Sequence, residues 1–107
     1  MSTAPQSQIL KLADLVAYQE GSVVSRQITK SDAGNVTLFA FDVGQELSEH
    51  TAPFDALVHI LDGEAEVRLA GVPYNLTAGD AIVMPANVPH ALTARTRFKM
   101  LLTMIRA

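Results

Sequence analysis

From Ser22 to the C-terminus, short runs of apolar and β-branched residues alternate with turn residues at regular intervals. This pattern is typical of a β-sandwich or barrel, because each run has the length of one strand and most interruptions contain glycine or proline. A chain of 107 residues is long enough for one domain with a sizeable core. We therefore predict a single all-β domain over residues 1–107, with strands at residues 22–28, 35–43, 56–61, 64–69, 72–76, 80–85, 90–94 and 98–105.

The N-terminal segment has a different pattern. Residues 1–8 are small and polar with one proline, as expected of a flexible terminal arm. Apolar residues then recur at helical spacing at Ile9, Leu12, Leu15 and Val16, before a glycine ends the pattern. We predict a short helical turn there and no other helix.

Two of the predicted strands are mostly apolar on both faces. In residues 64–69, charged residues alternate with apolar ones, so one face of that strand meets solvent. Residues 56–61 and 98–105 carry apolar side chains at both parities, which requires cover on both sides. With hardly any helix to supply it, the second cover is another sheet or a second subunit, and we expect a homodimer. The alternative is a monomeric sandwich whose terminal arm caps the outer face.

Composition excludes several classes of function. The chain has no cysteine, so it can form no disulfide, no thiolate metal site and no cysteine nucleophile. The net charge is −3 and no basic block is present, which gives nucleic acid little to bind. No apolar run approaches the roughly 20 residues that span a bilayer, and the N-terminus does not resemble a signal peptide. We expect a cytoplasmic protein with no membrane or nucleic-acid partner.

Three histidines are the candidates for chemistry. His50 follows an acidic stretch and lies near a predicted strand end, and His59 lies within an apolar strand. His90 follows two prolines, Pro85 and Pro89, whose rigid turn fixes where the next strand begins. A histidine on an apolar strand also occurs as an ordinary core residue. No Gly-x-Ser-x-Gly elbow and no phosphate-binding glycine loop is present, so no catalytic residue can be named.

Two segments, residues 44–63 and 79–94, carry glycine, histidine and proline at fixed spacings: Gly44, His50, Ala52, Ala56 and Gly63 in the first, and Gly79, Pro85, Asn87 and His90 in the second. This spacing resembles the two motifs of small single-domain cupins of the cupin 2 conserved-barrel type. The resemblance implies a double-stranded β-helix, the RmlC-like jelly roll, preceded here by a short helical turn.

The departures from these motifs affect the expected metal site. The resemblance implies two histidines and a glutamate from the first motif and one histidine from the second. His50 and His90 match, whereas Ala52 and Ala56 stand at the second histidine and the glutamate. The only motif ligands left for a divalent transition metal are therefore His50 and His90. Transition-metal sites ordinarily have three or more protein ligands. Three acids are near enough in sequence to lend an oxygen: Glu46, Glu49 and Asp55.

Strand parity predicts which side chains face the barrel interior. Positions 50, 52, 54 and 56 share one face, and His59 falls on the other, at the outer sheet or a dimer interface. Met84, Met100 and Met104 are three of the four methionines and lie on strands that line or back the barrel. We predict a mainly apolar ligand pocket formed by His50, Phe54, Met84, His90, Leu92, Met100 and Leu102.

Two functions are compatible with this site. The first is a small-molecule-binding barrel of unknown ligand that needs no metal. The alternative is a metal-dependent cupin enzyme, an oxygenase, isomerase or decarboxylase of a small organic acid, which uses His50 and His90. Fold alone does not decide between them.

Overall fold

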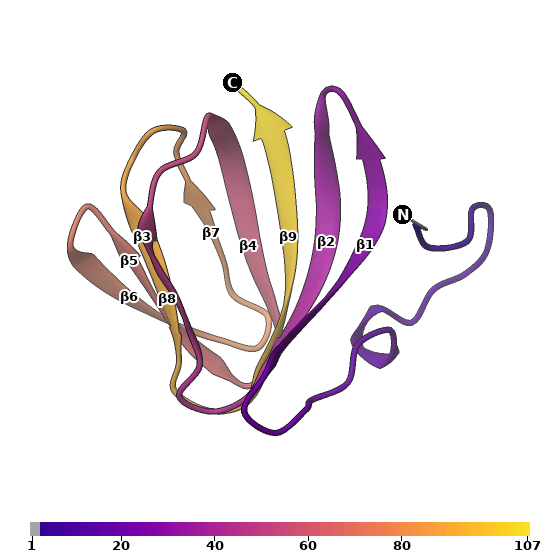
Figure 1. Cartoon of the computed structure of the whole chain (residues 1–107), viewed down its shortest axis with the longest axis horizontal. Helices are drawn as coiled ribbons and strands as arrows, with labels where there is room; N and C mark the ends of the chain where they lie inside the picture. Colours follow the sequence, from indigo (N-terminus) through magenta and orange to yellow (C-terminus); the bar gives the residue numbers. More distant parts are fainter. Residues whose placement is uncertain (1–2) are drawn as a thin grey trace.

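A computed structural model describes residues 3–107 of the chain as two facing β-sheets (Figure 1). The five-stranded sheet has the order β1-β2-β9-β4-β7, and the four-stranded sheet has the order β3-β8-β5-β6. The strand bounds are Val23–Ser31 (β1), Gly34–Phe41 (β2), Glu46–His50 (β3), Phe54–Asp62 (β4), Glu64–Leu69 (β5), Val72–Thr77 (β6), Ala81–Met84 (β7), His90–Ala94 (β8) and Phe98–Arg106 (β9). Every strand pairing is antiparallel. This confirms the all-β double-stranded β-helix expected from the sequence.

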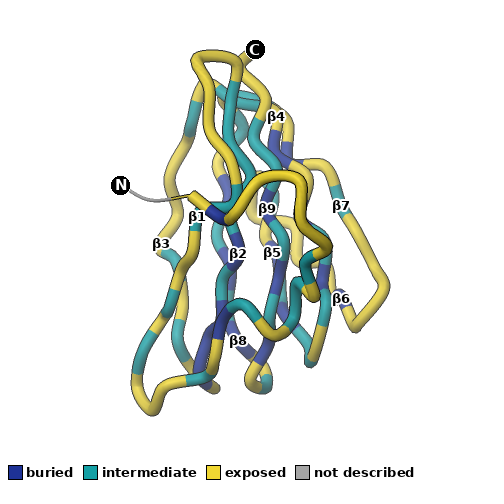
Figure 2. Tube along the Cα trace, turned by 90° about the vertical axis from the view of Figure 1, so that its right-hand side faces the viewer, coloured by how far each residue is buried: buried dark blue, intermediate teal, exposed yellow. Residues whose placement is uncertain are grey.

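The core lies between the two sheets. Alternate residues of each strand point inward, and the largest fully buried side chains include Phe41, Phe98 and Ile60. The Phe41 and Phe98 rings stack with centroids 4.4 Å apart. Figure 2 shows the buried stretches along the strands and the exposed ones mainly at the loops and at edge strands. One end of the barrel is therefore filled by aromatic rings, and any internal space lies elsewhere.

The N-terminal segment lies against the outer face of the five-stranded sheet (Figure 1). The predicted helical turn is a single 3-10 turn, η1 (Leu12–Asp14), and it is the only helical element within residues 3–107. Ile9 is 99% exposed and takes no part in packing. Of the arm expected over residues 1–8, residues 1–2 lie outside the described part. Ala4 is buried, and its amide donates to the Ile28 carbonyl at 3.1 Å. No helix in the described chain is long and apolar enough to cross a membrane.

Tyr18 holds the end of this segment against the sheet. Its hydroxyl donates to Asp62, and the Arg97 guanidinium and Lys99 ammonium lie 5.4 and 5.1 Å from its ring centroid. Arg97 also donates to Asp42 at 2.8 Å. Burial raises the pKa of Tyr18, and the hydrogen bond to Asp62 acts in the same direction. The segment is therefore fastened by both packing and polar contacts.

The arm supplies part of the second cover that the apolar strands require. Leu38 and Ala40 of β2 point outward yet are fully buried, because the residues around Val16 pack on them. The cover stops before the far side of the sheet, where Leu57 and Val83 are exposed. The N-terminal arm, the alternative to a second subunit, therefore covers only part of this face, and the homodimer stays a prediction.

Candidate functional site

A cavity of about 60 Å³ lies between the two sheets and is bordered by eleven residues: Leu47, His50, Ala52, Phe54, Ala56, Met84, His90, Leu92, Met100, Leu102 and Met104. All seven residues predicted to form the pocket are among them. The lining comes from β3, the following turn, β4, β7, β8 and β9. Strand parity therefore located the wall of the cavity, and its use as a ligand pocket stays a prediction.

Leu47 is the lining residue that the sequence reasoning missed. The sequence predicts no strand over residues 46–49, whereas β3 pairs with β8 along them. Three of the four are exposed, which explains the misreading. The register shifts between Leu47 and His50, so that three steps along β3 match two along β8. This bulge turns both Leu47 and His50 toward the interior, where strict alternation would allow only one of them.

His90 is placed by the proline-rich turn before β8. Asn87 adopts φ 64°, a left-handed conformation that asparagine tolerates, and its amide donates to the Ala52 carbonyl at 2.9 Å. His90 is then the first residue of β8 and the register partner of His50. The turn and the bulge together bring one histidine from each motif to the same point in the cavity.

The two imidazole rings meet edge to face, with centroids 4.3 Å apart and their Nε2 atoms 3.1 Å apart. His50 Nδ1 lies 2.7 Å from the Ser48 carbonyl oxygen, and His90 Nδ1 lies 3.2 Å from that of Val88. Carbonyl oxygens only accept hydrogen bonds, so each Nδ1 carries a proton and donates it. Two neutral rings then leave two Nε2 lone pairs facing each other. The pair can accept one further proton or a hydrogen bond donated by a ligand.

Burial lowers the pKa of His90 below its ordinary value, and the neighbouring His50 lowers it further, against the opposite effect of the Val88 carbonyl. The unfolded chain therefore binds more protons at this residue as the pH falls below about 6.5. We expect the free energy of unfolding to be highest above that pH and to decrease as the pH falls. Urea unfolding of the wild type and of His90→Gln, at about pH 7.5 and about pH 5.5, measures this effect. The decrease should be smaller in His90→Gln and unchanged in His59→Gln; an equal decrease in His90→Gln would contradict the assignment.

The donor set around this pair does not fit a resident metal ion. Ala52 and Ala56 line the cavity at the positions where the motif resemblance implies ligands, and they offer only methyl groups. Within residues 3–107, no three histidine, cysteine, aspartate or glutamate side chains are grouped so that they could hold a metal. The acids considered from the sequence do not line the cavity. Glu46 and Glu49 are exposed, and Asp55 accepts a hydrogen bond from the Ala86 amide.

His59 lies outside this site, as strand parity predicts. Its neighbours Val58 and Ile60 belong to the core between the sheets, so its side chain points to the outer face. The register of β4 with β7 runs without interruption from Ala56 to His59, so no bulge inverts the parity. His59 is therefore a suitable control residue for tests of the cavity histidines.

The family of the chain follows from comparison with known proteins. A family model described as a cupin domain matches residues 37–106. Comparison with curated protein sequences finds no significant match. The match covers both motif segments and most of both sheets, and the chain belongs to the cupin family.

Solved structures agree with this assignment. A conserved protein of unknown function from Streptococcus pyogenes is similar at 35% identity and a TM-score of 0.92, over 100% of this chain and 96% of that one. A cupin superfamily protein from Desulfitobacterium hafniense has 33% identity and a TM-score of 0.91, over 99% and 97% of the two chains. A predicted oxalate decarboxylase from Thermotoga maritima shares the fold, with a TM-score of 0.76 at 17% identity over 81% and 83%. These similarities establish the fold and leave the ligand to be argued from the site.

Proposed function

We propose that this cupin binds a small, mainly apolar molecule bearing one hydroxyl or carboxyl group, and that binding needs no metal. The observation that carries the proposal is the lining of the cavity. His50 and His90 are the only titratable residues among the eleven that border it, and the other nine are apolar. Such a pocket, apolar with a few convergent polar groups, is the usual form of a small-molecule site.

The chemistry of the wall defines the ligand class. The facing Nε2 atoms accept a hydrogen bond from a hydroxyl or an un-ionised carboxyl group, and once the pair holds a third proton it attracts a carboxylate. The rest of the ligand contacts methyl, thioether and phenyl groups. A second charged group would lose its hydration there without gaining a partner, at a cost of several kcal/mol. One polar end and one apolar end therefore fit, and two polar ends do not.

The size of the cavity limits the ligand. A volume of about 60 Å³ holds only about four or five water-sized groups. Three of the bordering residues are methionines, whose unbranched side chains can move to admit a somewhat larger molecule. Short aliphatic acids and alcohols are therefore suitable probes.

The alternative of a metal-dependent enzyme has one observation in its favour, namely that two Nε2 atoms 3.1 Å apart could both contact a single ion. Transition-metal sites in proteins ordinarily have at least three protein ligands. Alanine at two of the expected ligand positions leaves this requirement unmet. The hypothesis of an apolar ligand pocket accounts for all eleven bordering residues, whereas the hypothesis of a metal-dependent enzyme accounts only for the two histidines.

Methionine methyl resonances provide a test with a local readout. Met84, Met100 and Met104 border the cavity. In protein with isotope-labelled methionine methyl groups, we expect butyrate to shift these three resonances in a saturable way below about pH 6, where the histidine pair can take up a third proton. Succinate has the same number of carbon atoms but a second carboxylate in place of the terminal methyl group, and it should leave these resonances unchanged.

The histidine pair is tested by two matched variants. Below about pH 6, where the pair can take up a third proton, His90→Ala should weaken butyrate binding about tenfold or more, because it removes one of the two rings that share this charge, and a hydrogen bond to a charged group contributes about 1.5–3 kcal/mol. His59→Ala removes a histidine from the outer face and should leave the affinity unchanged. Equal shifts with butyrate and succinate, or equal affinity in wild type and His90→Ala, would refute the proposed ligand class.

A further inference from the structure

We propose that the cavity takes its ligand as a carboxylate, and that Arg106 and Lys30 at its opening set the preference for acids over alcohols. Because the proposed ligand class includes both acids and alcohols, this proposal rests on the proposed function and narrows it to acids. Three observations support it: where the cavity opens, which charges face the opening, and what those charges contact.

The opening of the cavity is marked by the exposure of the residues that border it. Six of the eleven bordering residues are buried and form its floor. The other five are half-buried or exposed: Leu47, His50, Ala52, Phe54 and Met104. They belong to β3, to the turn that follows it, to the start of β4 and to the end of β9. A ligand therefore enters at this end of the barrel, opposite the end that the aromatic rings fill.

Arg106 lies at this opening. It is the register partner of Phe54, and its guanidinium carbon lies 5.1 Å from the centroid of the Phe54 ring. On β9 it stands two residues beyond Met104, so its side chain leaves the strand on the cavity side. Its Nε donates to the Asp32 carbonyl at 3.0 Å, and its amide donates to the Ala33 carbonyl at 2.8 Å. These contacts hold a cation against one wall of the opening.

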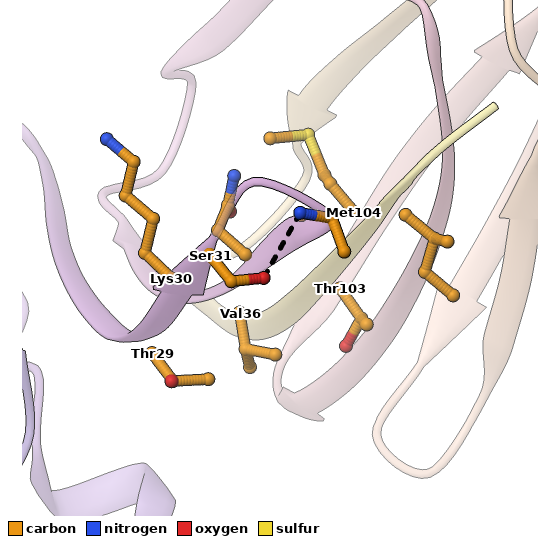
Figure 3. A pocket seen from close by; sticks show the side chains of 10 residues that line it. Thr29, Lys30, Ser31, Val36, Thr103 and Met104 are labelled. Atoms are coloured by element: carbon orange, nitrogen blue, oxygen red, sulfur yellow. Dashed lines mark hydrogen bonds between the residues drawn. The ribbon is translucent and has the colours of Figure 1, made fainter.

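Lys30 places a second positive charge on the same side of the sheet. It is the register partner of Asn35 on β2, and Asn35 is the register partner of Met104, which borders the cavity. Figure 3 shows the side chains of Lys30 and Met104 on one side of these strands and those of Val36 and Thr103 on the other. Lys30 is exposed, because β1 is an edge strand of its sheet. Its ammonium group is therefore free to attract an anion that approaches the opening.

No acidic side chain neutralises these two cations. Within residues 3–107, neither Arg106 nor Lys30 belongs to an ion pair. Asp55 lies between two residues that border the cavity, so it points to the outer face of β4. Asp32 contacts Arg106 through its backbone carbonyl. Glu49 is exposed and does not border the cavity.

Unpaired charges of one sign beside an apolar opening favour anionic ligands. Low-dielectric walls focus the field of such charges and raise the local concentration of anions. A carboxylate that passes Phe54 also meets the Arg106 guanidinium, whose planar set of donors matches carboxylate geometry. An alcohol carries no charge and gains little from either cation. The opening therefore separates two ligand types that both suit the histidine pair.

Titrations with butyrate and with 1-butanol measure this preference, with the methionine methyl resonances as the readout at about pH 5.5. The wild type should bind butyrate about tenfold or more tightly than 1-butanol. Lys30→Gln and Arg106→Gln should each weaken butyrate binding about two- to fivefold, the range expected for an exposed ion pair, and leave 1-butanol binding unchanged. Lys11→Gln is the matched control, because it removes the same charge from an exposed position on the N-terminal segment. It should affect neither ligand.

Arg106→Lys separates the charge of Arg106 from its packing on Phe54. It keeps the positive charge and should retain most of the preference for butyrate. Lys30→Gln leaves Phe54 untouched, so it tests the proposal even if Arg106→Gln failed to fold.

The outcomes distinguish this proposal from the proposed function. Equal affinity of the wild type for the two ligands, or a loss of butyrate affinity in Lys30→Gln no larger than in Lys11→Gln, would overturn the preference and leave the proposed function standing. If neither ligand shifted the methionine resonances, both would be wrong.

Discussion

The double variant Ala52→His, Ala56→Glu is expected to bind a divalent transition metal at least about a hundredfold more tightly than the wild-type chain. Both alanines border the cavity together with His50 and His90. The substitutions therefore give the site three imidazoles and one carboxylate, a donor set that suits zinc and similar ions. The two native Nε2 atoms are already 3.1 Å apart, so half of the ligands need little rearrangement.

Calorimetric titration with zinc of chelator-dialysed protein measures this gain. Ala91→His is the matched control. Its neighbours His90 and Leu92 on β8 border the cavity, so the side chain of residue 91 points to the opposite face of the strand. It should bind no better than the wild type. If the wild type itself bound zinc as tightly as the double variant, the two alanines would not weaken metal binding. The hypothesis that the chain works without a metal would then be wrong.

Gly63→Ala is expected to produce the largest loss of stability of any single substitution considered for this chain. Gly63 joins β4 to β5 with φ +76°, and an added Cβ would lie 1.9 Å from the Arg97 carbonyl oxygen. The obstacle is backbone, which cannot move aside as a side chain would. We expect a loss above about 4 kcal/mol, a large share of the stability of a domain of this size.

Gly71→Ala separates the two causes of that loss. Gly71 has a similar φ of +82°, but an added Cβ would meet no atom within 4 Å. It should therefore lose only the roughly 1–2 kcal/mol that a left-handed conformation costs an alanine. Comparing the urea unfolding midpoints of the two variants tests the close approach directly. Similar losses in both would mean that the strand end at Arg97 can move.

Much of the architecture could be predicted from the sequence because strand parity is a strict rule over short distances. The positions assigned to the interior, including Phe54 and Ala56, do border the cavity, and His59 does lie on the outer face. The motif spacings predicted the fold, because glycines such as Gly63 mark fixed points of it. At Gly63 two chain segments pass too closely for any side chain.

The rest could not be predicted because it depends on departures from that rule. β3 is mostly solvent-exposed and contains a bulge, so its sequence shows no alternation to recognise. The inward direction of Leu47 and the close approach of His50 to His90 both follow from this bulge. Apolar residues on both faces of a strand likewise indicate cover without saying what supplies it. Here the N-terminal segment covers Leu38, whereas Leu57 stays exposed.

The central claim, that the cavity between the sheets binds a small molecule without a metal, is tested most directly by one titration. Butyrate is added to chelator-dialysed protein, and again after zinc is supplied, while the methyl resonances of Met84, Met100 and Met104 report binding in the cavity. The account predicts saturable binding in the metal-free protein, with an affinity that zinc does not increase. Binding that occurs only after zinc is added would contradict it.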